Sequence, residues 1–309
     1  MGDRRDSNRV SDAAVRPPII EVRRAVAVAL AEDVLPLGDL SAVLLPDGVE
    51  ATAAFVPRAA GVLAGTDCAT EAFAQLDPAV SVRWTAADGD PVEAGDTVGT
   101  VEGPLASILT GERTALNFLN HLSGVATLTR RFVDAAASGG GTARVWDTRK
   151  TTPGLRTLEK AAVRAGGGWN HRGNLSEWVM FKDNHLERLG IAEAVRLGRA
   201  TWPARTIQVE ADSLAKVDAA LAAGADAILL DNLGLDDLRE AVARTDAHVA
   251  GGGARPLLEA SGGITLEAIA AVAATGVDVV SSSQITISAP VLDIGLDIDA
   301  DISRGAVAP

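Results

Sequence analysis

The segment from Asp147 to Gly154 has the residue types that a binding site for a small anion needs. It reads Asp-Thr-Arg-Lys-Thr-Thr-Pro-Gly and follows Arg144–Trp146, a short run that predicts a β-strand. The guanidinium of Arg149 can hold a carboxylate through two hydrogen bonds, and the ammonium of Lys150 acts as a compact point charge. The pair therefore suits a polyanionic ligand, although a basic pair in a surface loop has the same appearance in a sequence.

Two further polar motifs follow this segment. Gly166–Arg172 reads Gly-Gly-Gly-Trp-Asn-His-Arg, and Lys182–His185 reads Lys-Asp-Asn-His. The glycines allow close approach of the backbone, so that amide groups can face an anion. His171 and His185 have the chemistry of metal ligands, but we expect them to orient neighbouring groups or to donate to a ligand oxygen.

Polar side chains also end several predicted strands. Glu210 and Asp231 each close an apolar run, and Ser261-Gly262-Gly263 joins a strand to the start of a helix. The carboxyl ends of parallel strands carry the chemistry of α/β barrels, so these groups are expected to face one site. The amides of Gly262 and Gly263 suit a phosphate group near a helix N-terminus, the alternative being a simple tight turn.

The charge of the chain is unevenly distributed. The formal net charge is −13, which argues against general binding to nucleic acid or to an anionic membrane. Residues 144–188 nevertheless hold nine Lys or Arg and five Asp or Glu, a local balance of +4 that leaves −17 for the rest of the chain. This cationic segment fits capture of a small polyanion. Some of its charges, such as Glu159 and Lys160, are expected to lie on a solvated helix face.

The composition indicates a soluble cytoplasmic protein of about two domains. Of the 309 residues 47% are hydrophobic, and no apolar run approaches the roughly 20 residues that span a bilayer. Residues 1–18 lack the apolar core of a secretory signal and are interpreted as a disordered leader. Cys68 is the only cysteine, which excludes an intrachain disulfide, and we expect it to be a small buried residue.

The N-terminal part has the pattern of a small α+β domain. Apolar residues from Ile19 to Leu30 recur at helical spacing. Short β-prone runs separated by Gly, Pro and Asp come next, with a short helix over 70–76, and these runs cover residues 51–56, 61–64, 80–84 and 97–101. Such runs are typical of an antiparallel sheet. Residues 109–137 then predict one long helical segment that joins the two domains.

The C-terminal part alternates strands and helices. Strands are predicted at 207–210, 227–231, 257–260 and 277–281, and helices at 214–221, 235–242 and 266–273. Repeated βα units of this length build a parallel sheet, either a barrel or an open doubly wound sheet. We favour a barrel because polar residues stand where the strands end, at Glu210, at Asp231, at Glu259 to Ser261 and at Ser281 to Ser283. The glycine run 139–141 is interpreted as a plain loop and the run 251–253 as a flexible loop.

Taken in order, the motifs resemble those of one enzyme family. The motifs are Glu112–Asn117, Asp147–Gly154, Gly166–Arg172, Lys182–His185, Val209-Glu210, Leu230-Asp231-Asn232 and Ser261–Ile264. Over roughly residues 19–300 the chain is similar to quinolinate phosphoribosyltransferase, also called carboxylating nicotinate-nucleotide diphosphorylase.

The resemblance implies a fold and a reaction. The implied fold is an incomplete α/β barrel over residues 121–287 with a smaller N-terminal α+β open sandwich over residues 19–120, joined by residues 288–309. The implied enzyme is a pentosyltransferase that moves phosphoribosyl from phosphoribosyl pyrophosphate to quinolinate with decarboxylation, giving nicotinate mononucleotide for de novo NAD biosynthesis. Mg²⁺ is the implied cofactor. The implied assembly is a head-to-tail homodimer, with each active site between one subunit's barrel and its partner's N-terminal domain.

The resemblance also assigns roles to residues. The cationic residues that match quinolinate-binding positions are Arg113, Arg149, His171, Arg172 and Lys182, with Arg113 supplied across the dimer. Lys150 matches a lysine near the reacting centre, and Glu210 and Asp231 match acids around the ribose and its metal. These three form the predicted catalytic set. The positions that match the cradle of the 5′-phosphate are Ser261, Gly262 and Gly263.

The chain departs from the family pattern near the last predicted strand. The family has Val-Gly-Ala before Leu-Thr-His-Ser, whereas this chain has Ser282-Ser283-Gln284 before Ile-Thr-Ile-Ser. Ser283 therefore replaces the glycine near the phosphate, and Ile287 replaces the histidine. We expect the hydroxyls of Ser282 and Ser283 to donate hydrogen bonds to the phosphate instead.

Two other functions remain compatible with these residues. A barrel lyase or aldolase could use Lys150 or Lys182 as a Schiff base, because neighbouring cations depress the pKa of an amine. A barrel that only binds a phosphorylated ligand would keep the cationic site, but the paired acids Glu210 and Asp231 would then have less purpose.

Overall fold

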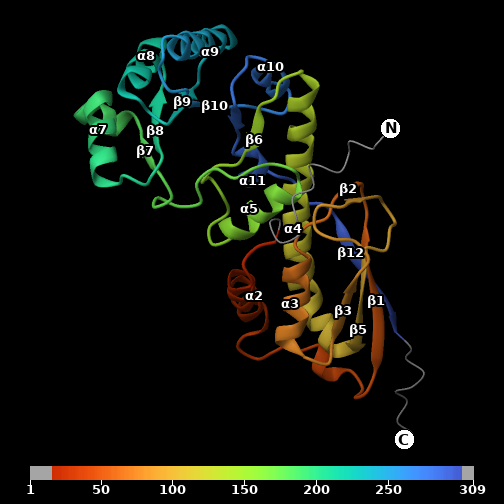
Figure 1. Ribbon diagram of the computed structural model, residues 1–309. Helices are drawn as coiled ribbons and strands as arrows, with labels where there is room; N and C mark the ends of the chain where they lie inside the picture. Colours follow the sequence, from red (N-terminus) through yellow and green to blue (C-terminus); the bar gives the residue numbers. More distant parts are fainter. Residues whose placement is uncertain (1–15, 301–309) are drawn as a thin grey trace, which may run out of the picture. The chain divides into compact units, whose positions relative to one another are not determined.

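The computed structural model describes residues 16–300, which form two compact units (Figure 1). The first unit holds the described residues up to 128, residues 152–167 and the described residues from 289 onward. The second unit holds residues 129–151 and 168–288. The predicted disordered leader, residues 1–18, lies almost entirely outside the described residues.

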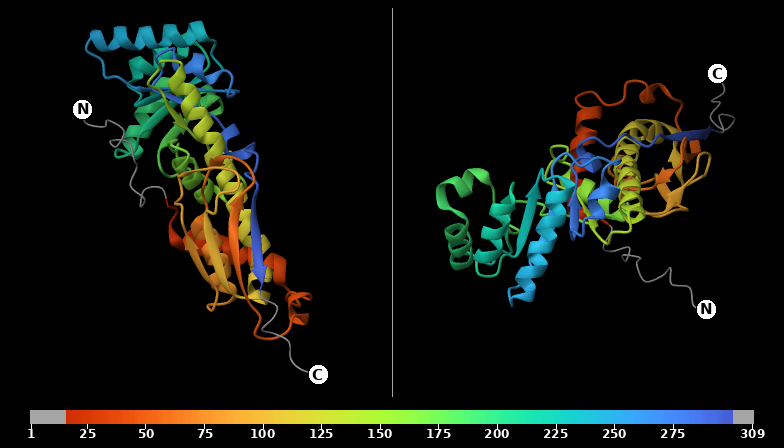
Figure 2. Two further views of the ribbon diagram at one scale, coloured as in Figure 1. Left: turned by 90° about the vertical axis from the view of Figure 1, so that its right-hand side faces the viewer. Right: turned by 90° about the horizontal axis from the view of Figure 1, so that it is seen from above.

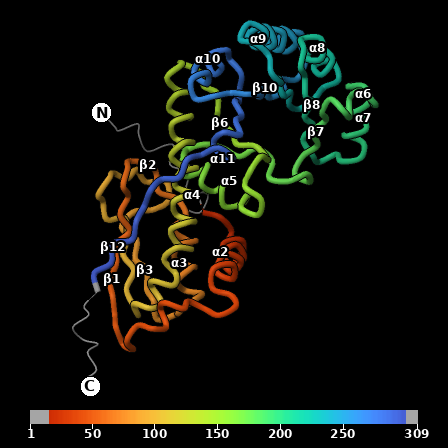
Figure 3. The backbone as a smooth tube through the Cα atoms, turned by 180° about the vertical axis from the view of Figure 1, so that it is seen from behind, coloured from red at the N-terminus to blue at the C-terminus, as the bar shows by residue number. Residues whose placement is uncertain are grey.

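An antiparallel sheet forms the centre of the first unit, as the short β-prone runs predicted. Its strand order is β12-β1-β5-β3, where the bounds are Glu50–Pro57 for β1, Ser81–Trp84 for β3, Gly99–Pro104 for β5 and Ile294–Ala300 for β12. A separate pair consists of β2 (Gly61–Val62) and β4 (Pro91–Val92). The alternate residues Ala51, Ala53 and Phe55 of β1 are buried, because one face of the strand covers the core. Strand β12 lies beside β1 although the two are far apart in sequence (Figures 2 and 3).

The first unit also contains helices, of which the one at Thr66–Leu76 packs against β3. Their bounds are Ile19–Val34 for α2, Thr66–Leu76 for α3, Leu105–Ser138 for α4 and Arg156–Ala165 for α5, with a 3₁₀ turn, η1, at Ala42–Leu44. The predicted helical spacing is confirmed, because α2 buries Val22, Val26 and Leu30. Cys68 on α3 is buried as expected, and burial followed by the charge of Asp88 raises the pKa of its thiol. The thiol is therefore inert.

The charged residues of α5 correct one expectation. Glu159 and Lys160 are 0% and 7% exposed, so the predicted solvated face is wrong for both. The Glu159 carboxylate pairs with His121 on α4, whose Nε2 lies 2.8 Å away, and it accepts a hydrogen bond from the Thr152 amide. Satisfied partners of this kind make the burial of a charge tolerable.

Six parallel strands form the sheet of the second unit. Their order is β6-β11-β10-β9-β8-β7, with bounds Arg144–Trp146 for β6, Val179–Phe181 for β7, Ile207–Ala211 for β8, Ala227–Asp231 for β9, Leu257–Ser261 for β10 and Val279–Ser281 for β11. Each strand from β7 onward pairs with the next one along the chain, and β11 pairs back with β6. This is the cyclic order of a barrel that stays open between β6 and β7, so the incomplete α/β barrel is confirmed over a doubly wound sheet.

Helices follow most of these strands. Their bounds are Asp183–Leu189 for α6, Ile191–Thr201 for α7, Leu214–Ala223 for α8, Leu235–Ala250 for α9, Ile269–Ala273 for α10 and Gln284–Ile287 for α11. Helices α7, α8 and α9 pack side by side. The run 251–253 is a hydrogen-bonded turn that ends α9.

The glycine run 139–141 is more than a plain loop. A Cβ on Gly139 would lie 2.3 Å from the carbonyl oxygen of Ala270, and one on Gly141 would lie 2.2 Å from that of Ala273. Real side chains never come so close. Glycine is therefore needed at both positions for the chain to pass against α10.

The free edge of β6 carries a short additional pairing. Trp169 forms a parallel bridge with Trp146. Its N–H donates to the Val145 carbonyl at 2.8 Å, and its carbonyl accepts from the Asp147 N–H at 3.1 Å. The segment 168–172 thus lies along β6, which brings the polar end of the glycine motif to the carboxyl ends of the strands.

Candidate active site

The carboxyl ends of the parallel strands enclose two adjoining compartments within the second unit. The cationic compartment, about 290 Å³, is lined by Arg149, Lys150, His171, Arg172, Lys182 and Glu259, among others. The acid–glycine compartment, about 490 Å³, is lined by Glu210, Asp231, Asn232, Gly262, Gly263 and Ser283, among others. Lys150, Lys182 and Ser261 line both, so the compartments share a wall. The structure therefore brings together nearly all the predicted site residues.

Buried Asp147 fixes the first two basic motifs relative to each other. Its carboxylate accepts hydrogen bonds of 2.8 Å from the side-chain amide of Asn170 and from the backbone N–H of His171. Asp147 itself immediately follows β6 and is 0% exposed. Arg149 and Lys150 continue from it, and the hydroxyl of Thr286 holds the Lys150 carbonyl at 2.8 Å. The loop that carries both cations is thus tied down at two points.

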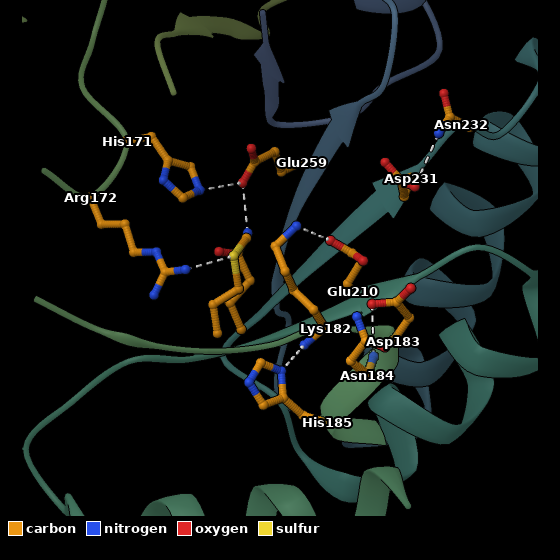
Figure 4. A network of polar contacts seen from close by, with 12 residues as sticks. His171, Arg172, Lys182, Asp183, Asn184, His185, Glu210, Asp231, Asn232 and Glu259 are labelled. Carbon is orange, nitrogen blue, oxygen red and sulfur yellow. Dashed lines mark hydrogen bonds and ion pairs between the residues drawn. The ribbon is translucent and has the colours of Figure 1, made fainter. Parts of the chain in front are cut away.

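His171 lies in a buried network of polar and aromatic side chains (Figure 4). Its Nε2 is 3.4 Å from the Glu259 carboxylate, which also accepts a 2.6 Å hydrogen bond from Gln208 Nε2. The Trp178 indole donates to Gln208 at 3.1 Å, and its ring lies against the His171 ring with 4.7 Å between centroids. Burial alone would raise the pKa of Glu259, but the contacts with His171, Ser281 and Gln208 hold that pKa below its ordinary value. Glu259 is therefore ionised.

Arg172 is only 6% exposed. It donates to the Trp178 carbonyl and to the sulfur of Met180, both at 3.2 Å. Its buried Nε has no partner among the described residues. Burial, and then repulsion from Arg149, lower the pKa of this guanidinium, although it stays charged at neutral pH. A buried guanidinium with an unmatched donor is suited to an anionic ligand.

Lys182 spans the wall between the compartments. Its ammonium lies 2.8 Å from the Glu210 carboxylate, and its side chain is 51% exposed (Figure 4). The backbone N–H of Lys182 donates to His185 Nδ1 at 3.1 Å, which caps the start of α6. His185 therefore orients its neighbour, as expected.

The acid–glycine compartment is shaped mainly by backbone. Asn232 has a positive φ of 56°, its N–H donates to the Ser261 carbonyl, and its side chain donates to Asp231 at 3.0 Å. Gly262 has a φ of 102°, and a Cβ there would lie 2.3 Å from Asn232 Oδ1. Only glycine satisfies both the dihedral angle and the contact.

The structure corrects the expected role of Ser282. Its hydroxyl donates to the Ile264 carbonyl at 2.8 Å and is 4% exposed, so its single proton is already used. Ser283 lines the compartment as expected, and Ile287 is 51% exposed. Both serines line the compartment, but within residues 16–300 only the hydroxyl of Ser282 is engaged by a carbonyl in this way.

Arg113 belongs to the first unit. It lies on α4 and is exposed. That unit has its own cavity of about 400 Å³ between α2 and α4, and none of the predicted site residues lines it. The other predicted quinolinate-binding residues all belong to the second unit.

Two family models match the chain, one in each half. The model of the quinolinate phosphoribosyl transferase N-terminal domain matches residues 39–123, and that of the C-terminal domain matches residues 125–297. The chain belongs to the quinolinate phosphoribosyl transferase family. Its resemblance, first seen in the ordered motifs, is confirmed.

Members of the family with known names and structures resemble the chain over most of its length. The nicotinate-nucleotide pyrophosphorylase (carboxylating) of Mycobacterium leprae is 42% identical over 257 residues, which are 82% of this chain and 88% of the relative. The probable enzyme of the same name from Bacillus subtilis is 40% identical, over 84% of this chain and 88% of the relative. The solved nicotinate-nucleotide pyrophosphorylase of Francisella tularensis has a TM-score of 0.84 and 37% identity, covering 94% of this chain and 98% of that one.

Several residues of this family site escaped prediction from sequence. Asp147 was visible only as part of a motif, while Gln208 and Trp178 had no pattern around them. Glu259 belongs to none of the motifs, although it lies near the end of a predicted strand.

Within residues 16–300 no helix is long and apolar enough to cross a membrane.

Proposed function

We propose that this member of the quinolinate phosphoribosyl transferase family transfers phosphoribosyl from phosphoribosyl pyrophosphate to quinolinate and releases carbon dioxide, giving nicotinate mononucleotide and pyrophosphate. The observation that carries the proposal is the pair of adjoining compartments, one cationic and one lined by acids and glycines. Quinolinate has two carboxylates on a small ring, and phosphoribosyl pyrophosphate has a 5′-phosphate and a pyrophosphate. The two compartments match these two anions.

In the cationic compartment, Arg149, His171 and Arg172 bind the quinolinate carboxylates. Arg172 and His171 are held by buried partners, so the ligand finds donors that are already oriented. Lys182 completes this set from the shared wall, and it exchanges part of its interaction with Glu210 for a substrate carboxylate. The dicarboxylate thus offsets a cluster of positive charge.

In the acid–glycine compartment, Glu210 and Asp231 face the ribose and Mg²⁺. Mg²⁺ is commonly held by one or two carboxylates together with substrate phosphates and waters. These two acids line one cavity and fit that pattern, while residues 16–300 contain no group of three or more His, Cys, Asp or Glu that could hold a metal alone. Bound Mg²⁺ would offset charge on the departing pyrophosphate. Ser261, Gly262 and Gly263 cradle the 5′-phosphate through their amides.

The chemistry follows from this placement. The ring nitrogen of quinolinate attacks the anomeric carbon as the bond to pyrophosphate breaks, and positive charge develops on the ribose. The carboxylates of Glu210 and Asp231 stabilise that charge. The new bond leaves the ring nitrogen cationic, so the ring accepts the electron pair released when the adjacent carboxylate leaves as carbon dioxide. The ring carbon then takes a proton. Lys150, at the wall between the compartments, orients both substrates.

A direct assay tests this function. Purified protein is incubated with quinolinate, phosphoribosyl pyrophosphate and Mg²⁺, and nicotinate mononucleotide is measured. We expect product in a one-to-one ratio with carbon dioxide, and loss of activity with a chelator that Mg²⁺ restores. Folded protein that makes no product would overturn the proposal.

We further propose that a homodimer completes the site with Arg113 from the partner subunit. What supports this is that Arg113 is an exposed cation in the first unit, whereas the rest of the quinolinate set lies in the second. Inactive Arg113→Ala and inactive Lys150→Ala proteins should regain activity when mixed under conditions of subunit exchange, because hybrid dimers contain one intact site. If labelled subunits exchange and no activity returns, Arg113 does not act across the dimer.

The Schiff-base alternative has little support in the site. A reactive lysine of that kind is desolvated in apolar surroundings or beside another cation. Lys150 and Lys182 are both exposed, and Lys182 is paired with a carboxylate. Borohydride trapping with a carbonyl compound should leave both lysines unmodified.

A further inference from the structure

Glu259 is a buried acid inside a compartment that otherwise collects positive charge. It lies on β10, in the middle of the parallel sheet, and its side chain is 1% exposed. It contacts neither the acid–glycine compartment nor the predicted metal ligands. Burying a carboxylate costs free energy unless partners satisfy it, so its contacts indicate what it does.

His171 and Gln208 both contact the same oxygen of the Glu259 carboxylate. A carboxylate can only accept hydrogen bonds, so the ring nitrogen facing it, Nε2, carries a proton. Gln208 donates to the same carboxylate oxygen, and through its own oxygen it accepts from the indole of Trp178. The Trp178 ring in turn lies against the His171 ring, so the contacts form a closed loop. Each member of this ring of four side chains limits the movement of the next.

The backbone of His171 is held from the opposite direction. Asp147 accepts the His171 N–H at 2.8 Å, so a second buried acid fixes the main chain while Glu259 fixes the ring. Two carboxylates therefore determine the position and the tautomer of one imidazole at the wall of the cationic compartment. Such support is what a side chain needs in order to meet a ligand without prior rearrangement.

We propose that Glu259 is a positioning residue for quinolinate: it acts through His171 to hold the imidazole in the orientation and tautomer that receive the dicarboxylate. The inference rests on the proposed function, because it assigns quinolinate to the cationic compartment. Glu259 does not touch the substrate in this account, and phosphoribosyl pyrophosphate binding does not depend on it.

The first unit supplies a matched control. Glu159 and His121 form a second buried acid–imidazole pair, with a separation of 2.8 Å, and Glu159 is 0% exposed. This pair lines neither compartment of the site. Substitution of Glu159 by Gln removes the same charge and keeps an oxygen that can accept from the Thr152 amide, so it measures what the loss of a buried Glu–His ion pair does to the fold.

The test compares Glu259→Gln, His171→Ala, the double variant and Glu159→Gln. In Glu259→Gln the amide oxygen can still accept from both His171 and Gln208, so the variant keeps the shape of the network and removes only the negative charge that holds the imidazole. Dissociation constants for quinolinate and for phosphoribosyl pyrophosphate are measured by calorimetry, with melting temperatures alongside. We expect Glu259→Gln to weaken quinolinate binding about tenfold and to change phosphoribosyl pyrophosphate binding less than about twofold. Glu159→Gln should lower the melting temperature and leave quinolinate binding within about twofold.

The double variant decides whether Glu259 acts through His171. If it does, adding Glu259→Gln to His171→Ala weakens quinolinate binding by less than about twofold further, because the group that Glu259 orients is already absent. Fully additive losses, or equal losses for both substrates, would overturn the inference. If Glu259→Gln does not fold, Glu259→Asp carries the same test, since it keeps the charge and shortens the reach toward His171.

Failure of this inference is distinguishable from failure of the proposed function. Wild-type protein that binds quinolinate and forms nicotinate mononucleotide, while Glu259→Gln binds quinolinate normally, removes the positioning role alone. Wild-type protein with no affinity for quinolinate removes the function itself.

Discussion

In the cationic compartment neighbouring groups hold His171 and Arg172 in place, whereas the acid–glycine compartment is shaped mainly by its backbone. His171 and Arg172 are 7% and 6% exposed and have fixed partners. Glu210 and Asp231 are only half-buried, and the shape around them comes from the positive φ angles at Asn232 and Gly262. The first arrangement favours one rigid aromatic dicarboxylate. The second presents two half-buried acids, each contacted by one polar side chain, to a metal ion and a flexible sugar phosphate.

Removing Lys150 should have the largest effect. Its side chain lines both compartments, so its loss affects the binding of both substrates. An unmatched substrate charge costs several kcal/mol, so Lys150→Ala should lower kcat by roughly a hundredfold or more with the fold intact. Steady-state rates together with circular dichroism check this. Near-normal turnover in the folded variant would remove Lys150 from the site.

Arg149 tests the cationic compartment by itself. Arg149→Gln removes one charge and shortens the side chain but keeps a polar amide. We expect the KM for quinolinate to rise about thirtyfold and the KM for phosphoribosyl pyrophosphate to change less than about threefold, because the lost contact belongs to one substrate. Equal rises in both KM values would show that the compartments do not divide the substrates.

Ser283 gives the smallest expected effect and tests the other compartment. Its hydroxyl stands where the resemblance predicts a glycine, and a hydrogen bond to a charged group is worth about 1.5–3 kcal/mol. Ser283→Ala should therefore weaken phosphoribosyl pyrophosphate binding about tenfold and leave quinolinate binding nearly unchanged. Calorimetry with each substrate measures both. Tighter phosphoribosyl pyrophosphate binding by Ser283→Gly would mean that the side chain crowds the phosphate instead of binding it.

The strands and the motif residues of the barrel were predictable because their signals are local. Strands β6 and β9 have the predicted bounds. A short β-prone run that ends next to a polar residue can be recognised from the sequence alone. Strand β12 was not identified as a strand, because its pairing partner, β1, lies at the other end of the sequence. The three residues of β7 are too few to show a period.

The errors concern groups whose role depends on tertiary contacts. Glu159 and Lys160 are charged residues of a type that usually lies on a solvated helix face, yet both are buried on α5. The contacts of Glu159 with His121 and Thr152 explain why its carboxylate is stable there. Ser282 and Ser283 are equivalent in sequence, but a carbonyl at Ile264 occupies the hydroxyl of Ser282 alone. Local patterns cannot report such partners.

The pairing of Trp169 with β6 also affects how the protein behaves in a concentrated solution. An uncovered edge of a sheet presents N–H and C=O groups that a strand of another molecule can join, which leads to aggregation. Trp169 uses its own N–H and C=O on Val145 and Asp147, so part of that edge is closed to a foreign strand. The segment that delivers His171 and Arg172 to the ligand therefore also protects the open side of the barrel, and loosening it would reduce solubility together with affinity.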